Sequence, residues 1–275
     1  MGEITFNGIT STSVGIQVAH PPMYVYPEKD SEAVHVPGRN GDIIIDKDSY
    51  KNVPREYEIT VYDQAHPEWT YSQRVVKLSN WLHSARGYAK LSDTYDAGYF
   101  RKARYVEEAQ EIENFINQGG AGTITFDCRP ERYYASYTVY HGDPSVSETY
   151  DSDTAAAMTE NFTLFNPTRN NGAIYYAKPY LKISNPLNLT FTLKCREDQS
   201  GSGYPDTLLS VTGATVSSGE CWIIVDSDLQ VVSSNSETPF TYTLPNGFPI
   251  FKEYCRIQIP TGVSTIEVIP RWYII

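Results

Sequence analysis

Two carboxylates, Asp226 and Asp228, stand two residues apart directly after the apolar run Trp222–Val225. On a strand both would face the same side, roughly 7 Å apart, which falls within the separation of about 5 to 10 Å that glycosidases use. Glycosidase carboxylates usually come from different strands, however, and an Asp-Ser-Asp turn after an apolar strand is the commoner arrangement. We therefore interpret Asp226 and Asp228 as turn residues.

The sequence also lacks the residue patterns that other types of enzyme need. No Gly-x-Ser-x-Gly or Ser-x-x-Lys nucleophile motif is present, and the five histidines are scattered. The glycines of 119–122 are not followed by Lys-Ser or Lys-Thr, so that segment is predicted to be a hairpin connection and not a phosphate loop. No two cysteines form a Cys-x-x-Cys pair, which disfavours a zinc or redox site; the cysteines are Cys128, Cys195, Cys221 and Cys255. The sequence predicts a protein that is not an enzyme and that holds no cofactor and no metal.

Charge excludes a further class of function. The chain has 275 residues and a net charge of −11, and its first 135 residues (14 basic, 19 acidic) and the remainder (8 basic, 14 acidic) are both acidic. Neither part is suited to neutralising phosphates, so no specific or general nucleic-acid binding is expected. No apolar run is long enough to span a bilayer and the first residues do not resemble a secretory signal, so we expect no membrane partner and retention where the chain is made.

One charged segment departs from this pattern. Arg101, Lys102 and Arg104 form a basic cluster, and Glu107 and Glu108 follow closely. Blocks of charge are usually solvated faces, and a strand edge in water is the ordinary interpretation. The alternatives are a charged contact between subunits, in which the basic face of one copy meets the acidic face of the next, or a lining that faces DNA inside a channel.

The first half of the chain is predicted to be mainly β with one helix. Tyr57, Ile59 and Val61 alternate with polar residues, which indicates a strand with one face in a core. Thr70 can cap a helix whose apolar stripe includes Leu78 and Leu82. The ranges 4–6, 16–18, 43–45, 88–91 and 100–107 are also strand-like, and Gly87 is the expected helix stop.

The second half is predicted to be an antiparallel β-sandwich. Polar and small residues dominate from about 136 to 160, and short strand-like runs then recur from 162 to 269. Many short strands with regular turns, together with 22 tyrosines, favour a sandwich. We expect a mainly β chain of two domains: residues 1–137, a linker region 138–158, and a second domain 159–275.

Exposed aromatic residues would offer stacking surfaces for sugars. Tyr176, Tyr180 and Trp272 are the candidates for contacting a glycan or a partner. Trp222 lies in an apolar run and is interpreted as core packing, whereas Trp272 could either stack on a ligand or pin the last strand.

A family resemblance joins these observations. The matching segments, in order, are Val36-Pro-Gly-Arg-Asn-Gly-Asp through Asn52, the helix around Trp81-Leu82, Asp127 through Tyr133, Phe165-Asn-Pro-Thr168 and Pro270-Arg-Trp272. None is specific alone. Their order over nearly the whole chain resembles the distal tail (Dit) proteins of long-tailed phages that infect Gram-positive bacteria, in their short form.

The resemblance implies a structural hub. It implies an N-terminal tail-tube-type β domain, with one helix and a long hairpin, that forms a hexameric ring, and a galectin-like or carbohydrate-binding-module-like C-terminal sandwich. The ring would join the tail tube and tape measure proteins to the tail-tip or lysin protein and to receptor-binding proteins, in one ring or in stacked rings. Arg39, Asn40 and Asp42, with the charged cluster described above, are the candidate ring contacts. The protein would be located at the distal tail of the virion, after assembly in the bacterial cytoplasm.

Two other functions remain open from the sequence. The first is a free-standing carbohydrate-binding or adhesin protein, which would use the C-terminal aromatic residues and bind host cell-wall glycan. The second is a tail-associated hydrolase.

Overall fold

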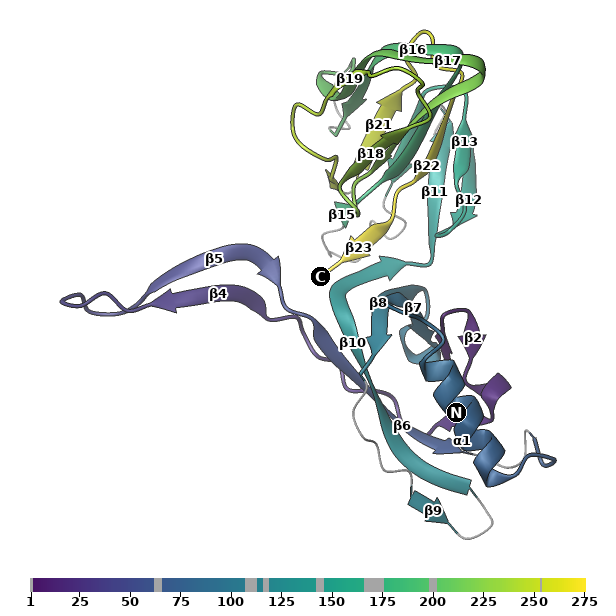
Figure 1. The fold of residues 1–275 in the computed structure, drawn as a ribbon. Helices are drawn as coiled ribbons and strands as arrows, with labels where there is room; N and C mark the ends of the chain where they lie inside the picture. Colours follow the sequence, from purple (N-terminus) through teal and green to yellow (C-terminus); the bar gives the residue numbers. More distant parts are fainter. Residues whose placement is uncertain are drawn as a thin grey trace. The chain divides into compact units, whose positions relative to one another are not determined.

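The chain divides into two compact β-rich units. The computed structural model describes residues 2–61, 66–106, 113–115, 119–141, 146–165, 176–197, 202–252 and 254–275. Unit 1 comprises Met1–Arg132 with Ile275, and unit 2 comprises Tyr133–Ile274 (Figure 1). The contact pattern thus divides the chain at 132/133, whereas the sequence placed the end of the first domain at 137. The described parts of the expected linker, 138–158, belong to unit 2 and lie mostly in strands.

Unit 1 is built on one antiparallel sheet with the strand order β2-β1-β7-β8-β10-β6-β3. A bridge between Gly2 and Val18 joins the chain start to the other end of this sheet. The strands are β1 (Ile4–Phe6), β2 (Ile9–Thr10), β3 (Ile16–Val18), β6 (Val53–Val61), β7 (Ala89–Asp93), β8 (Tyr99–Tyr105), β9 (Glu113–Phe115) and β10 (Gly119–Tyr134), with 3-10 turns η1 (Thr12–Val14) and η2 (Thr94–Asp96).

The glycine cluster does not form the expected hairpin connection. Gly120 and Gly122 lie inside β10 and pair with Val61 and Ile59 of β6, so the prediction for 119–122 was wrong. Glycine weakens a strand, yet it is accommodated where another backbone or side chain approaches closely, and here β9 and β6 flank this end of β10.

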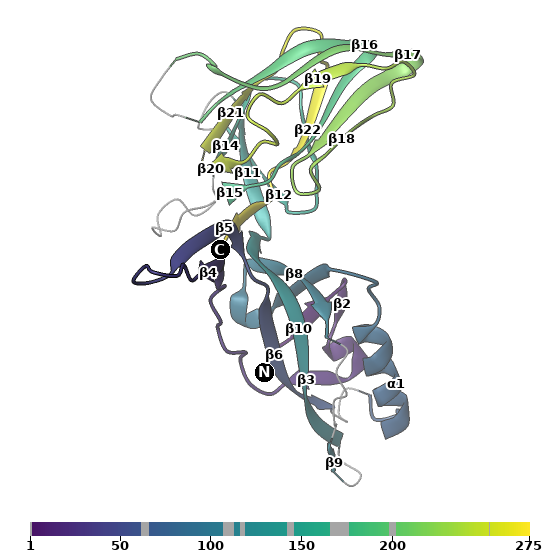
Figure 2. The ribbon, with the colours of Figure 1, turned by 60° about the vertical axis from the view of Figure 1, so that its left-hand side comes forward.

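The core of unit 1 follows the predicted alternation. Tyr57, Ile59 and Val61 are at most 1% exposed, and the intervening Glu56 and Glu58 face solvent. The helix α1 (Tyr71–Leu82) lies on one side of the strands of unit 1 (Figure 2). It packs against this core through Leu78, Trp81 and Leu82. Trp81 Nε1 donates to the carbonyl of Ile9 at 3.1 Å.

The start of α1 was predicted correctly and its end was not. Thr70 is the N-cap, and its side chain forms a capping box with Gln73. The helix ends at Leu82, before the expected stop at Gly87. No helix among the described residues is long and apolar enough to cross a membrane.

Two strands of unit 1 stay outside its sheet. β4 (Lys29–Val34) and β5 (Ile43–Tyr50) pair only with each other, as a separate two-stranded sheet. Figure 1 shows them as a long ribbon that extends away from the rest of unit 1. We call residues 29–50 the arm and residues 35–42, which connect its strands, the arm tip.

Unit 2 contains two sheets that share two long strands. In one, the order is β13-β22-β16-β17-β18, and in the other it is β12-β11-β14-β21-β16-β17-β19. The strands are β11 (Ser136–His141), β12 (Ser147–Asp151), β13 (Ala156–Met158), β14 (Phe162–Phe165), β15 (Tyr176–Ala177), β16 (Tyr180–Arg196), β17 (Asp206–Asp226), β18 (Val231–Ser234), β19 (Thr241–Thr243), β20 (Phe251–Lys252), β21 (Tyr254–Gln258), β22 (Thr265–Ile269) and β23 (Trp272–Ile274).

The long strands pass from one sheet to the other at irregularities in the pairing. The register between β16 and β17 shifts between Pro186 and Asn188, and Leu187 there has a φ of 82°. Bulges of this kind form the corners at which a strand changes sheets. Pro186 lies at this irregularity, where a proline, which has no N–H group to donate, is tolerated and β16 continues beyond it.

The capping box allows a first test of unit 1. Replacing Thr70 by alanine removes the hydrogen bond from the Gln73 amide to Thr70 Oγ1 and should lower the free energy of unfolding by about 1 kcal/mol. Urea denaturation followed by tryptophan fluorescence measures this change. Ser72→Ala, on the exposed side of the same helix turn, is the control and should change stability by less than about 0.5 kcal/mol. Equal effects for both variants would contradict the cap assignment.

Candidate functional site

Asp226, the first of the two carboxylates considered for catalysis, has a structural role. Asp226 Oδ1 accepts the backbone N–H groups of Asp228 and Leu229 at 3.0 and 3.1 Å, which confirms the turn interpretation. Arg271 then binds both oxygens of Asp226, at 2.6 and 3.1 Å. The hydrogen-bonding capacity of Asp226 is therefore used to join the end of β17 to the chain before β23. Among the described residues, no cluster of His, Cys, Asp and Glu could hold a metal ion.

The aromatic residues singled out for sugar binding are engaged inside unit 2. Trp272 is 1% exposed, so it has no ring face free for a sugar. Tyr176 packs against Tyr273, with ring centroids 6.0 Å apart, and the Arg271 guanidinium lies 5.7 Å from the ring centroid of Tyr180.

Trp222, by contrast, does not lie in the core as the sequence suggested. It is half-buried and alternates with the buried Cys221 and Ile223. The apolar run that contains Trp222 has one face in the core and the other at the surface, a distinction that hydrophobicity alone does not make.

The arm exposes apolar side chains on both of its faces. Successive residues of a strand point to opposite sides, and Ile43, Ile44 and Ile45 are 37%, 63% and 49% exposed. An isolated two-stranded hairpin is marginally stable in water, and exposed apolar residues in a row mark an interaction surface. The arm therefore has the composition of an element that is completed by a partner.

The charges of the arm are mostly paired within it. Lys29 contacts Asp46, Lys47 lies 3.5 Å from Asp30, and His35 Nδ1 lies 3.1 Å from Asp42 Oδ1 at the base of the tip. Gly38 and Gly41 provide the positive φ values, 84° and 83°, that turn the chain. The tip spans eight residues between the last paired positions, Val34 and Ile43, and is therefore longer than a tight two-residue hairpin turn.

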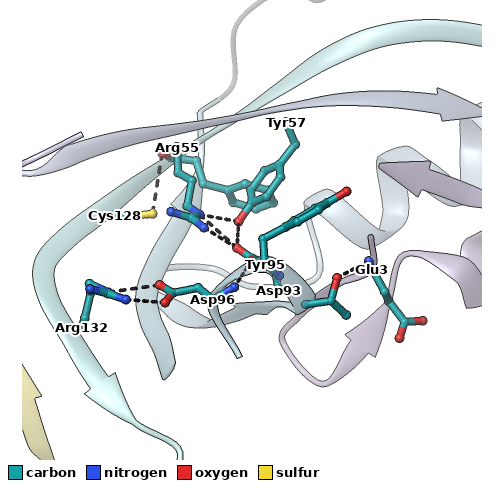
Figure 3. A network of polar contacts seen from close by, with 10 residues as sticks. Glu3, Arg55, Tyr57, Asp93, Tyr95, Asp96, Cys128 and Arg132 are labelled. Carbon is teal, nitrogen blue, oxygen red and sulfur yellow. Dashed lines mark hydrogen bonds and ion pairs between the residues drawn. The ribbon is translucent and has the colours of Figure 1, made fainter. Parts of the chain in front are cut away.

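A polar network joins Arg55, Asp93, Asp96 and Arg132 (Figure 3) and extends through Arg132 to the segment that leads into the arm. Arg132 forms an ion pair with Asp96, and its Nη1 donates to the hydroxyl of Tyr24 at 2.8 Å. The guanidinium also lies 4.4 Å from the ring centroid of Tyr99. Tyr24 precedes the arm by only a few residues. We call residues 20–25 the arm root, and these contacts hold the arm root against the end of β10.

Asp93 connects this network to the core. Its Oδ2 accepts from Arg55 Nη2 at 2.7 Å and from the Tyr57 hydroxyl at 2.6 Å, and its Oδ1 accepts the N–H groups of Tyr95 and Asp96 at 2.9 Å. Burial, above all, raises the pKa of Tyr57, so the hydroxyl keeps its proton and donates it. Burial alone would lower the pKa of Arg55, but Tyr57 and Asp93 together raise it. The group is a buried, hydrogen-bonded ion pair.

A groove lies beside the root of the arm. The extended segment His20–Val25 forms one wall, and the outward face of β6 and β10 forms the floor, giving a volume of about 240 Å³. The lining residues are His20, Pro21, Pro22, Met23, Val25, Pro54, Glu56, Glu58 and Thr123. The groove thus combines apolar walls with two carboxylates.

The structure places the predicted ring-contact residues in different settings. Arg39, Asn40 and Asp42 are exposed at the arm tip. Arg104 is exposed and pairs with Asp127 at 2.8 Å, and Lys102 is half-buried. Arg101 is only 4% exposed, with its guanidinium 6.0 Å from the ring centroid of Tyr24. Glu107 and Glu108 lie outside the described residues.

The network around Asp93 was not evident from the sequence. One signal was available: Arg55 shares the strand face of Tyr57 and Ile59, and a cation on a core-facing position requires a buried counter-charge. Its partner, 38 residues away, could not be named from spacing.

The network predicts a large loss of stability for Asp93→Asn. The amide leaves Arg55 buried without a counter-charge, which should lower the free energy of unfolding by about 3 to 5 kcal/mol. Chemical denaturation measures it. Asp42→Asn, which affects an exposed contact with His35, is the control and should cost less than about 1 kcal/mol. A loss below about 1 kcal/mol for Asp93→Asn would show that the pair contributes little.

Comparison with known proteins gives a likeness in structure only. No family model matches the sequence, and no curated protein matches it. Among solved structures, the phage SPP1 Dit protein (gp 19.1), described as a paradigm of the hub adsorption apparatus in phages that infect Gram-positive bacteria, has a TM-score of 0.56 and 13% identity, and the match covers 99% of this chain and 98% of that chain.

The baseplate of phage p2 in its activated conformation, with Sr or Ca, gives TM-scores of 0.48 and 0.49 at 11% identity, with 99% of this chain and 96% of that chain covered. The match to the SPP1 Dit protein confirms the predicted mainly β, two-domain architecture, and this chain shares that fold along nearly its whole length.

Proposed function

We propose that this protein is a structural component of a phage tail: a distal tail protein that assembles into a hexameric ring and serves as the hub between tail tube and tail tip. The observation that carries the proposal is the arm, a two-stranded ribbon that pairs with no other strand and exposes isoleucines on both faces. The fold shared with the SPP1 hub protein supports it.

The arm favours a ring over a two-fold symmetric dimer. A ring needs two different, complementary surfaces on each subunit, so that one surface of each copy contacts the other surface of its neighbour. The arm is a projecting surface, whereas the groove is a receiving one. A contact between the two is heterologous and closes if the rotation per subunit completes a circle.

The partners follow from the proposed position in the tail. On one side the ring would contact the tail tube protein and the tape measure protein, and on the other the tail-tip or lysin protein and the receptor-binding proteins. Unit 2 would serve as the outer attachment domain. The protein would act in the virion, at the distal tail, without catalysing a reaction.

A free-standing carbohydrate-binding protein is the less favoured function. It would need exposed aromatic rings on unit 2, and the burial of Trp272 removes the strongest of the three candidates. Tyr176 and Tyr180 retain partial exposure, but both already contact neighbouring side chains.

Solution mass tests the proposal. Light scattering should give six copies of 31.0 kDa, or twice that, for the intact chain. Replacing residues 30–49 by a short Gly-Ser connection should leave a folded monomer, because the surface that joins neighbours is gone. Leu229→Ser, at an exposed apolar residue of unit 2 (66% exposed), is the control and should assemble normally. An arm-deleted protein with the same mass as the intact chain would contradict the proposal.

A further inference from the structure

We propose that the arm tip of one copy docks in the groove beside the arm root of the next copy, where Arg39 pairs with Glu56 and Glu58. This inference rests on the proposed assembly into a ring and identifies its contact. The groove is here assigned as the receiving site, and its occupant as a second copy of this chain.

The groove has unused negative charge between apolar walls. Glu56 is exposed on β6, and among the described residues its carboxylate has no hydrogen-bond or ion-pair partner. Glu58 has only a distant contact, 3.8 Å from His20 Nε2. Met23, 84% exposed, and Val25, 40% exposed, stand beside these carboxylates. Such a surface suits a ligand with one cation flanked by apolar groups.

The arm tip has that composition. Arg39 is exposed at its end, and no side-chain partner for it exists among the described residues, whereas the other cations of the arm are paired within it. Val36 and Pro37 precede Arg39, and the exposed isoleucines of β5 follow the tip. A guanidinium can bind two carboxylate groups with its fork of donors, so it suits a site with Glu56 and Glu58 on one strand face.

The geometry excludes the groove of the same copy. The groove lies at the arm root, because its wall, residues 20–25, leads directly into β4. Six paired positions of β4, with one register shift between Asp30 and Ser31, separate the root from the tip, and at about 3.3 Å per residue they span about 17 to 20 Å. A paired ribbon cannot fold back over that distance onto its own root. The tip therefore reaches a groove only on another molecule, which yields a head-to-tail contact.

The negative net charge of the chain makes a local pairing of opposite charges important where two copies meet. Copies with a net charge of −11 repel one another, so a contact between them needs a cation on one side at the point of approach. Arg39 is brought to the carboxylates of the neighbour, and the desolvated apolar rim strengthens the attraction.

Disulfide cross-linking tests the contact directly. The four native cysteines are buried and should not form disulfides between copies. Any cross-link therefore comes from the engineered cysteines. In the Arg39→Cys/Glu56→Cys variant, mild oxidation should link successive copies and give a reducible ladder of multimers on a denaturing gel. Arg39→Cys/Asn80→Cys, with the second cysteine on the exposed face of α1, should give at most tip-to-tip dimers. Arg39→Cys alone sets that background.

Each outcome has a distinct meaning. A ladder specific to the Arg39/Glu56 pair supports the docking. Normal assembly by light scattering without such a ladder overturns the docking and leaves the ring proposal standing. A wild-type chain that remains monomeric at all concentrations overturns both.

Charge exchange gives a second test that does not depend on oxidation. Arg39→Glu places a carboxylate against Glu56 and Glu58, and should raise the concentration needed for half-assembly by at least about tenfold. Glu56→Arg should weaken assembly as well, and the combination Arg39→Glu/Glu56→Arg should recover most of the loss. Additive loss in the double variant would show that the two residues do not meet.

Discussion

The carboxylate of Asp93 is the contact on which the rest of unit 1 depends. One of its oxygens neutralises Arg55 on the core side of β6, and the other holds the backbone of η2. That turn presents Asp96 to Arg132, and Arg132 in turn holds Tyr24. A chain of charge-assisted hydrogen bonds thus runs from the sheet core to the root of the arm. An unpaired charge in this position would be costly, so each ion pair in this series is held by the next, from the core to the segment before the arm.

This series of contacts explains how the direction of the arm can be fixed although no other strand pairs with it. The arm pairs with no further strand, so its direction is set by the segment before it, where residues 20–25 lie beside β6 and β10 and Tyr24 contacts Arg132. The same residues form a wall of the groove. The two surfaces of the proposed ring contact, the arm and the groove, are therefore built on one segment, and a displacement of that segment would alter both together.

The sequence predicted those features that depend on local chemistry. The capping box at Thr70 and the alternation through Tyr57, Ile59 and Val61 arise from neighbouring residues, and both were confirmed. Features set by distant residues were not predictable. The glycines of 119–122 belong to a strand because β6 and β9 pair beside them. Arg101 is buried, and its guanidinium lies near the ring of Tyr24, which is distant in the sequence. Pro186 bends a strand that continues, since the second sheet of unit 2 receives it.

In the candidate site, too, the sequence indicates the local features but not those that depend on distant residues. Arg39, Asn40 and Asp42 could be named from a glycine-rich turn, but nothing near them in the sequence indicates that their strands pair with no third strand. Glu56 and Glu58 are ordinary solvent-facing residues of an amphipathic strand until the segment 20–25 passes beside them and makes a groove. Solvated carboxylates of this kind contribute little to a monomer. Their value changes when a guanidinium arrives with apolar neighbours, because exclusion of water strengthens the pairing. The residues most informative about assembly are therefore those that the isolated chain leaves unsatisfied.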